Sequence, residues 1–355
     1  MNTKEEKPLL VMAHARCFDG AAAAWVFWRR FPDAEIHFVQ YGDPVPVDVT
    51  DRVVVVVDFC FDLDTTIELI QKARSYTMLD HHPLARKVVQ GVTDWVHKVA
   101  FPISASMKAD DGNECSFECD GVPGKWGTFH VQWIEDQSGA MQAWNFCYTE
   151  SGKGSTFGAN GLRMLPPDLI VYHDDYDRWE RKNPKTDAYI AGLGKYPLSL
   201  DTFKKLFPNG RNPNLGADAL VEEGAPFVEY RNGLINSIIK ETKHYLKVRG
   251  PDGNIYTVPV ANAPKQLISY VSDALNHETP NPPFSLVYYD TKKGRVYRFG
   301  SSKTAMDVTP IAEFWGGGGH AHASGTIHNK RANLFTPWNG FVQRFKRFFK
   351  LDMRK

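Results

Sequence analysis

Short apolar runs alternate with amphipathic segments through the first ninety residues of the chain. The runs predicted as strands are residues 8–13, 34–40, 52–57 and 76–79, and the helical segments between them are residues 20–31 and 63–74. The run at 52–57 contains five consecutive valines, which suit a parallel strand covered on both faces. The alternation therefore predicts an α/β domain built on a parallel sheet.

The pattern changes further along the chain. Residues 97–132 alternate only weakly and are interpreted as a β-hairpin insertion, after which a helix at 136–148 and a strand at 169–172 are expected. Residues 218–248 have the periodicity of a long amphipathic helix. Short strands follow, with helices at 268–275 and 308–314. The predicted parts are a first domain at 1–215, a connector helix at 216–249, a smaller α+β domain at 250–329 and a tail at 330–355.

Composition excludes several classes of protein. Of the 355 residues, 43% are hydrophobic and 23% charged, as in ordinary globular proteins, and the formal charge of +1 gives no general attraction for polyanions. The longest apolar run, residues 21–28, is too short for a membrane helix. No signal peptide is expected, and five cysteines form no even framework, so a cytoplasmic location is predicted. Cys115 and Cys119 are interpreted as free thiols rather than zinc ligands.

Polar residues follow the predicted strands at the point where each strand ends. They are His14, Asp19, Asp58, Asp80, His81, His82, Asp174, Asp175 and Asp177. Carboxylates and imidazoles hold Mn²⁺ and similar ions, and two such ions about 3.5–4 Å apart promote phosphate ester hydrolysis. Asp58 ends a buried run of valines and particularly needs a cation. Ordinary loop carboxylates and helix caps are the alternative, but several clusters, each after a strand, favour a metal site.

A glycine run at 316–319 is the second candidate site. Glycines allow backbone N–H groups to converge on an anion, and the imidazole of His320 can donate to a phosphate oxygen. A P-loop is excluded because no Lys-Ser or Lys-Thr follows the run. A flexible linker is disfavoured by the ordered pattern around it, with Trp315 before and His-Ala-His-Ala after.

These residues also carry a resemblance to a known family. His14-Ala-Arg-Cys-Phe-Asp19-Gly20, Asp58 after its valines, Asp80-His81-His82 and Asp175-Tyr-Asp177-Arg-Trp179 resemble the four successive motifs of DHH phosphoesterases. Asp136-Gln-Ser138-Gly139-Ala140 resembles the helix before the fourth motif, and the run from Gly316 to Gly325 is similar to the DHHA1 signature. The resemblance covers residues 8–96 and 133–328, and implies a parallel-sheet DHH domain joined by a long helix to a smaller α+β DHHA1 domain.

The resemblance implies a role for each matching residue. The implied ligands of two Mn²⁺ ions, with Mg²⁺ or Co²⁺ as alternatives, are His14, Asp19, Asp58, His81 and Asp175, with Asp58 bridging. His82 would contact the scissile phosphate, and Asp80 would orient a histidine. The implied substrate-binding residues are Gly317, Gly318, Gly319, His320 and Arg298.

Two positions depart from the family pattern. Members often carry His-x-x-x-Asp-x-Asp in the first motif, whereas this chain has only Asp19, five residues after His14. One metal is therefore short of a ligand: either Asp174 or Asp177 supplies it, or the second metal binds more weakly. Arg298 is displaced from the usual arginine position, which Gly300 or Ser301 occupies.

The resulting hypothesis is a phosphodiesterase that hydrolyses short single-stranded oligonucleotides or dinucleotides through a hydroxide shared by the two metals. Cyclic dinucleotides, nucleotide bisphosphates and inorganic polyphosphate are alternative substrates. An inactive nucleotide-binding or nucleic-acid-binding protein is the alternative of another class. The active site is expected in a cleft between the domains, where the 97–132 insertion either caps it or mediates a homodimer.

The tail is strongly basic and aromatic. Residues 330–355 hold eight Lys or Arg against one Asp, with four phenylalanines at helical spacing. Packing of that aromatic face on the second domain is favoured over binding to a nucleic acid backbone.

Overall fold

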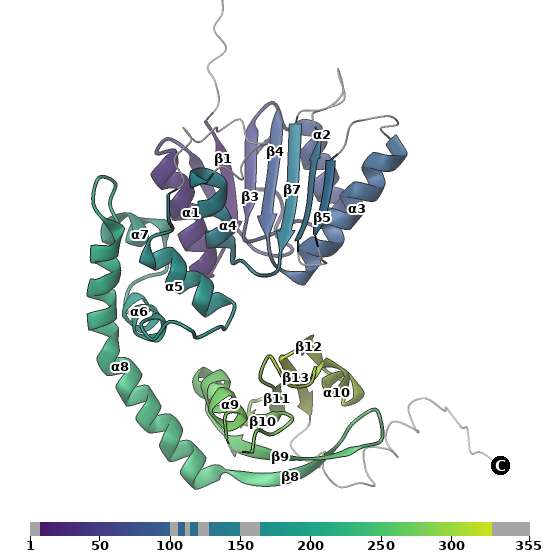
Figure 1. Ribbon diagram of the computed structural model, residues 1–355. Helices are drawn as coiled ribbons and strands as arrows, with labels where there is room; N and C mark the ends of the chain where they lie inside the picture. The colour runs from purple at the N-terminus through teal and green to yellow at the C-terminus, as the bar shows by residue number, and fades with distance from the viewer. Residues whose placement is uncertain are drawn as a thin grey trace, which may run out of the picture. The chain divides into compact units, whose positions relative to one another are not determined.

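The computed structural model describes residues 8–99, 106–110, 114–119, 128–149, 164–278 and 280–328. The chain divides into two compact units, Met1–Val228 and Glu229–Lys355 (Figure 1). Within the described ranges, no helix is long and apolar enough to cross a membrane. The basic tail at 330–355 lies outside the described residues, so its role stays a prediction.

The first unit is built on a seven-stranded sheet with a parallel core. Its strands are β1 (Leu10–His14), β2 (Glu35–Val39), β3 (Val53–Val57), β4 (Ser75–Asp80), β5 (Ser106–Asp110), β6 (Glu114–Cys119) and β7 (Thr128–Ile134). The order is β2-β1-β3-β4-β7-β6-β5, in which the first five strands are parallel and the last two antiparallel. The predicted parallel sheet is confirmed, and the β5–β6 hairpin within the 97–132 segment extends its edge.

Helices cover both faces of this sheet (Figure 1). Val55 and Val57 pack in one core with α1 (Phe18–Arg30) and α4 (Gly139–Tyr148). Val54 and Val56 face the opposite core, with α2 (Leu63–Lys72) and α3 (Pro83–Val99). The run of valines is therefore explained by burial on both sides, since successive strand residues point to opposite faces.

One predicted element has the wrong type. Residues 169–172, expected as a strand, belong to helix α5 (Asp168–Asp177). Leu169, Ile170, Tyr172 and His173 are buried, which is the spacing of one helical face. A short apolar run such as this cannot be assigned by periodicity alone, and packing against α4 and α6 (Thr186–Leu193) decides it. The chain continues into α7 (Leu200–Leu206). The carbonyl of Phe207, the residue after α7, accepts a hydrogen bond at 2.9 Å from Nε1 of Trp25 in α1.

The long helix α8 (Pro213–Thr242) begins and ends earlier than its pattern predicted. The division between the compact units falls within it, after Val228. Residues His244–Arg249, assigned from sequence to the same helix, instead form strand β8. The second unit therefore includes strand β8, which the sequence pattern placed in the connector helix at 216–249.

The second unit contains a six-stranded sheet in the order β12-β13-β11-β10-β9-β8. Its remaining strands are β9 (Ile255–Asn262), β10 (Ser285–Asp290), β11 (Arg295–Gly300), β12 (Gly318–His320) and β13 (Ala323–His328). A 3₁₀ turn η1 (Lys265–Leu267) and helix α9 (Ile268–Asn276) connect β9 to its parallel neighbour β10, and α10 (Thr309–Phe314) precedes β12. The second unit thus combines a mixed sheet with short helices.

Candidate metal centre

The predicted site residues meet at the point where the sheet reverses its strand order. β1 and β3 are neighbours, and the helices that follow them pack on opposite faces of the sheet. Open parallel sheets bind ligands at such a switch point, outside the carboxyl ends of the strands. His14 ends β1, Asp58 follows β3, and Asp80 ends β4. Three separate segments thus bring imidazole and carboxylate groups to one edge.

Asp58 lies at the centre of this edge. Its side chain is fully buried, and its backbone has a φ of 57°, a conformation that non-glycine residues rarely adopt. One carboxylate oxygen lies 3.6 Å from His14 Nδ1, and the other lies 3.3 Å from His81 Nε2. Within the described part of the chain, neither oxygen has a hydrogen-bond partner. A buried carboxylate is stabilised by a positively charged neighbour such as His81 or by a metal ion.

The ligand atoms fall into three overlapping groups, each with its atoms within 4.8 Å of one another. The groups are His14, Cys17 and Asp58; Asp19, His81 and Asp177; and Asp58, Asp80, His81 and His82. Asp19 lies in the first turn of α1 and is fixed there, because its carboxylate accepts a hydrogen bond at 3.1 Å from the Ala140 amide at the start of α4. These buried groups could hold metal ions.

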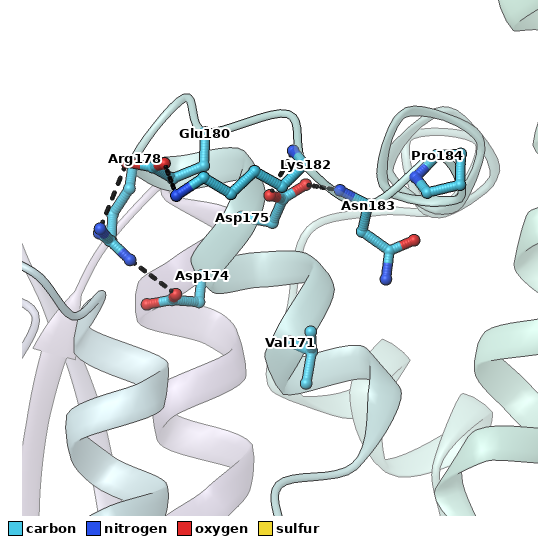
Figure 2. Close-up of a pocket in the computed structure, with 8 residues that line it drawn as sticks. All are labelled: Val171, Asp174, Asp175, Arg178, Glu180, Lys182, Asn183 and Pro184. Atoms are coloured by element: carbon cyan, nitrogen blue, oxygen red, sulfur yellow. Dashed lines mark hydrogen bonds and ion pairs between the residues drawn. The ribbon is translucent and has the colours of Figure 1, made fainter. Parts of the chain in front are cut away.

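Asp175 does not join these groups, which corrects its predicted role as a metal ligand. Its carboxylate accepts hydrogen bonds from the Lys182 amide at 2.8 Å, the Asn183 amide at 3.3 Å and the Thr186 hydroxyl at 2.6 Å. Figure 2 shows the side chain turned toward residues 182 and 183. Asp175 therefore holds the loop after α5, whereas Asp177 lies 3.3 Å from His81 Nε2.

A pocket of about 400 Å³ lies beside this loop (Figure 2). Asp174 lines it and links two elements, accepting from the Ser138 amide at 2.8 Å and from Arg178 at 3.1 Å. None of the grouped ligand atoms comes from the residues that line the pocket. The pocket is therefore separate from the candidate metal centre.

The Asp80-His81-His82 turn is held by its own hydrogen bonds and by the neighbouring strand. One Asp80 oxygen accepts from the His81 and His82 amides and lies 2.7 Å from His82 Nδ1. Buried Gln142 donates to the Asp80 carbonyl at 3.1 Å, and Trp133 Nε1 donates to the His81 carbonyl at 3.0 Å. These contacts fix both imidazoles.

The negative charge at the centre shifts the pKa values of its members. Burial lowers the pKa of His81, but the nearby Asp58 and Asp177 carboxylates outweigh burial and raise it to about 10. Burial raises the pKa of Asp58, yet the nearby imidazoles of His14 and His81 lower it overall below its usual range. Burial, and then the charge of Asp58, raise the pKa of Asp19. The site without a cation therefore retains protons that a metal would displace.

The metal-free protein is expected to lose stability as pH rises from 6.5 to about 10. The pKa of folded His81 is raised above its ordinary 6.5, so its contribution is complete below pH 6.5 and is lost toward pH 10. The raised pKa of Asp19 acts in the same direction. The slope is at most about 1.4 kcal/mol per pH unit for each proton. Urea unfolding in EDTA would measure it, and added Mn²⁺ should flatten it. A stability that is constant or rises over this window in EDTA would contradict the expectation.

Part of the glycine run has a structural role, so not every amide of the run can contribute to the predicted cradle. Gly316 and Gly317 donate their amides to carbonyls of α10, at 2.9 and 2.8 Å, and so close the end of that helix. Gly318 and Gly319 belong to β12, which pairs with β13. The Gly317 amide is therefore not available to a ligand.

Two other predicted substrate-binding residues belong to the same sheet. The side chain of His320, the last residue of β12, lies outside the described residues. Arg298 on β11 is half-buried, burial lowers its pKa, and its Nε has no hydrogen-bond partner in the described structure. A half-buried guanidinium whose Nε lacks a partner fits a residue that contacts an anion.

Sequence reasoning missed one member of the centre and left another as an alternative. The sequence pattern does not identify Cys17 as a ligand, although it lies two residues before Asp19 in the first motif. The same pattern offers Asp177 only as an alternative ligand. The signal for Asp177 was present in the spacing, because residues two apart point to opposite sides of a helix. It was hidden by the assignment of residues 169–172 to a strand.

Comparisons with known proteins give distant similarities. No protein-family model matches the chain. An uncharacterized protein, R106, of Acanthamoeba polyphaga mimivirus is 20% identical over 336 residues, which cover 89% of this chain and 66% of that protein's length. This chain thus spans just under two thirds of that relative.

Three solved structures are similar over nearly the whole chain. PggH from Vibrio cholerae, a pGpG-specific phosphodiesterase, is 13% identical, with 96% of this chain and 97% of that chain covered and a TM-score of 0.43. An exopolyphosphatase-related protein from Bacteroides fragilis is 14% identical, with 97% and 92% covered and a TM-score of 0.36. An uncharacterized protein from Helicobacter pylori G27 is 13% identical, with 96% and 98% covered and a TM-score of 0.32. Similarities at this level assign no role to any residue.

Proposed function

We propose that this chain is a metal-dependent phosphoesterase of the DHH type, acting on short oligonucleotides or dinucleotides. One observation carries the proposal. Asp58 lies between His14 and His81 with both carboxylate oxygens buried and, among the described residues, without a hydrogen-bond partner. A carboxylate in this position can serve two cations at once, which is what a phosphoesterase with two metals requires.

The ligand groups divide between the two ions. His14 and Asp58 would hold one ion, and Asp19, Asp58, His81 and Asp177 would hold the other. The fit rests on the unpartnered buried atoms of the described structure, which are His14 Nδ1, Asp19 Oδ1, both Asp58 oxygens and His81 Nε2. When bound, two such ions neutralise charge on phosphoryl oxygens and lower the pKa of water. Mn²⁺, with Mg²⁺ or Co²⁺ as alternatives, suits the oxygen and imidazole donors.

His82 is placed to stabilise charge on the substrate. Burial lowers its pKa, but Asp80 outweighs burial and raises it overall, so the imidazole retains its proton to higher pH. With Nδ1 donating to Asp80 at 2.7 Å, a proton on Nε2 remains for a phosphate oxygen. Its ring lies 5.6 Å from that of His14 and 4.4 Å from that of His81, which keeps this donor beside the proposed ligands.

An aromatic side chain borders the same site and favours a nucleotide as the substrate. Tyr41 lies two residues after the end of β2 and is 42% exposed. The centroid of its ring is 5.4 Å from that of the His14 ring and 6.2 Å from that of the His82 ring. An exposed aromatic ring beside a phosphate site can stack on any nucleotide base. Arg298 and His320 of the second unit are proposed to contact a substrate phosphate. Cyclic dinucleotides and nucleotide bisphosphates carry the same groups and remain alternatives.

The test is hydrolysis of a substrate panel with and without metal. The panel holds a linear dinucleotide, a short oligoribonucleotide, a cyclic dinucleotide, a nucleotide bisphosphate and inorganic polyphosphate. EDTA treatment is expected to reduce hydrolysis to background, Mn²⁺ to restore it, and the dinucleotide to have the highest kcat/KM. Undiminished hydrolysis in chelator would exclude the metal mechanism. Metal binding without hydrolysis of any substrate would instead support an inactive nucleotide-binding protein.

A further inference from the structure

Cys17 lies in the turn between β1 and α1, two residues before Asp19. The turn is set by Arg16, whose φ of 58° reverses the chain after β1. Cys17 is the N-cap residue of α1, and its carbonyl accepts from the Ala21 amide at 3.2 Å. Its side chain makes no capping hydrogen bond to the helix, and the thiol forms no disulfide in the described structure. The sulfur is therefore neither a helix cap nor part of a disulfide there.

The sulfur is close to two potential ligand atoms that lack partners. Cys17 Sγ, a ring nitrogen of His14 and a carboxylate oxygen of Asp58 all lie within 4.8 Å of one another. His14 Nδ1 and both oxygens of the fully buried Asp58 have no hydrogen-bond partner among the described residues. An unpaired buried carboxylate beside a thiol and an imidazole is an independent indication of a cation at this point.

The neighbouring carboxylates belong to other ligand groups or to hydrogen bonds outside this one. Asp19 and Asp177 form a group with His81, and Asp175 holds the loop after α5. One Asp80 oxygen is occupied by His82 and the backbone of the turn. Within the described chain, Cys17 is the residue that completes a three-ligand group with His14 and Asp58.

We propose that Cys17 is a thiolate ligand of the metal ion held by His14 and Asp58. This inference rests on the proposed function and refines its choice of metal. A thiolate is a soft ligand that favours Zn²⁺, Co²⁺ or Fe²⁺ and disfavours Mn²⁺ and Mg²⁺. The two ions of the centre would then differ in kind, because the Asp19, His81 and Asp177 group offers only oxygen and imidazole donors.

Cobalt binding to the full chain tests this directly, without an activity measurement. Metal-free protein is titrated with Co²⁺, and the spectrum is recorded for the wild type, Cys17→Ser and Cys17→Asp. The wild type is expected to show a near-ultraviolet thiolate-to-cobalt charge-transfer band that both variants lack. Competition with a chromophoric chelator should show Zn²⁺ affinity lowered by about tenfold or more in Cys17→Ser, since even indirect changes near a metal have that effect. Cys17→Asp should shift the preference toward Mn²⁺.

Cys147→Ser is the matched control. Cys147 is buried in α4 and belongs to none of the ligand groups, so its variant should keep the charge-transfer band. Melting temperatures of all variants, measured without metal, identify any that fail to fold. Cobalt d–d absorption with no charge-transfer band in the wild type, or an equal band in Cys17→Ser, would overturn the role of Cys17 alone. No cobalt absorption at all would overturn the metal centre and the proposed function with it.

Discussion

Asp58→Asn is expected to lower kcat/KM for a dinucleotide by about 10³-fold or more and to reduce the bound metal. Two metals supply several kcal/mol of charge stabilisation, and about 1.4 kcal/mol corresponds to a tenfold change in rate. Asparagine has nearly the same size and tolerates the φ of 57° at this position, so the backbone should keep its conformation. Steady-state kinetics and metal analysis of the same preparation would measure both effects.

Asp175→Asn is the matched control for this change. Asp175 is also a buried aspartate, but it accepts hydrogen bonds from Lys182, Asn183 and Thr186 instead of joining a ligand group. Its replacement should lower the free energy of unfolding by roughly 1.5–3 kcal/mol, as for hydrogen bonds to a charged group, and leave the metal content unchanged. A variant of Asp58 that retained full metal content and activity would remove the basis of the proposed function.

Gly139→Ala is expected to destabilise the protein and displace the central carboxylate. A Cβ on Gly139 would lie 2.3 Å from Asp58 Cβ and 2.7 Å from its Cα, closer than atoms can pack, and Asp58 cannot retreat because it is fully buried. Overpacking of this kind costs about 1–3 kcal/mol. Urea unfolding should detect the loss, and metal titration should show weaker binding.

Gly233→Ala is the matched control. It measures the effect of replacing a helical glycine with alanine where no clash occurs. Gly233 lies in α8, and a Cβ there would meet nothing within 4 Å. Alanine should therefore stabilise the helix by about 0.5–1 kcal/mol. If Gly139→Ala matched Gly233→Ala in stability and bound metal as the wild type does, the close approach of α4 to Asp58 would not shape the site.

The strands of the first sheet were predictable because burial on both faces leaves a clear mark in sequence. The valines of β3 must pack against two layers of helices, so the run is continuous, and it ends where Asp58 begins the ligand edge. Parallel strands end at the same edge of a sheet, so the nearness of His14, Asp58 and Asp80 follows from that pattern. The resemblance to DHH phosphoesterases added roles, which stay proposals.

The error in the fourth motif shows what local pattern could not decide. In a strand, Asp175 and Asp177 would point to the same side, whereas in a helix they lie about 200° apart around the axis. Packing of α5 against α4 and α6 selects the helix. That choice turns Asp177 toward His81 and Asp175 toward the following loop.

The sequence by itself determined the parallel sheet, the edge where its polar residues gather and the need of a buried Asp58 for a cation. Tertiary structure alone decided which aspartate of α5 reaches the centre, that Cys17 completes a ligand group, and that the first glycines of the 316–319 run close a helix. The physical reason is the direction of side chains. The position of a residue at the end of a strand can be predicted from the sequence pattern. The direction of a side chain in a turn or a helix depends instead on packing against segments that are distant in the chain.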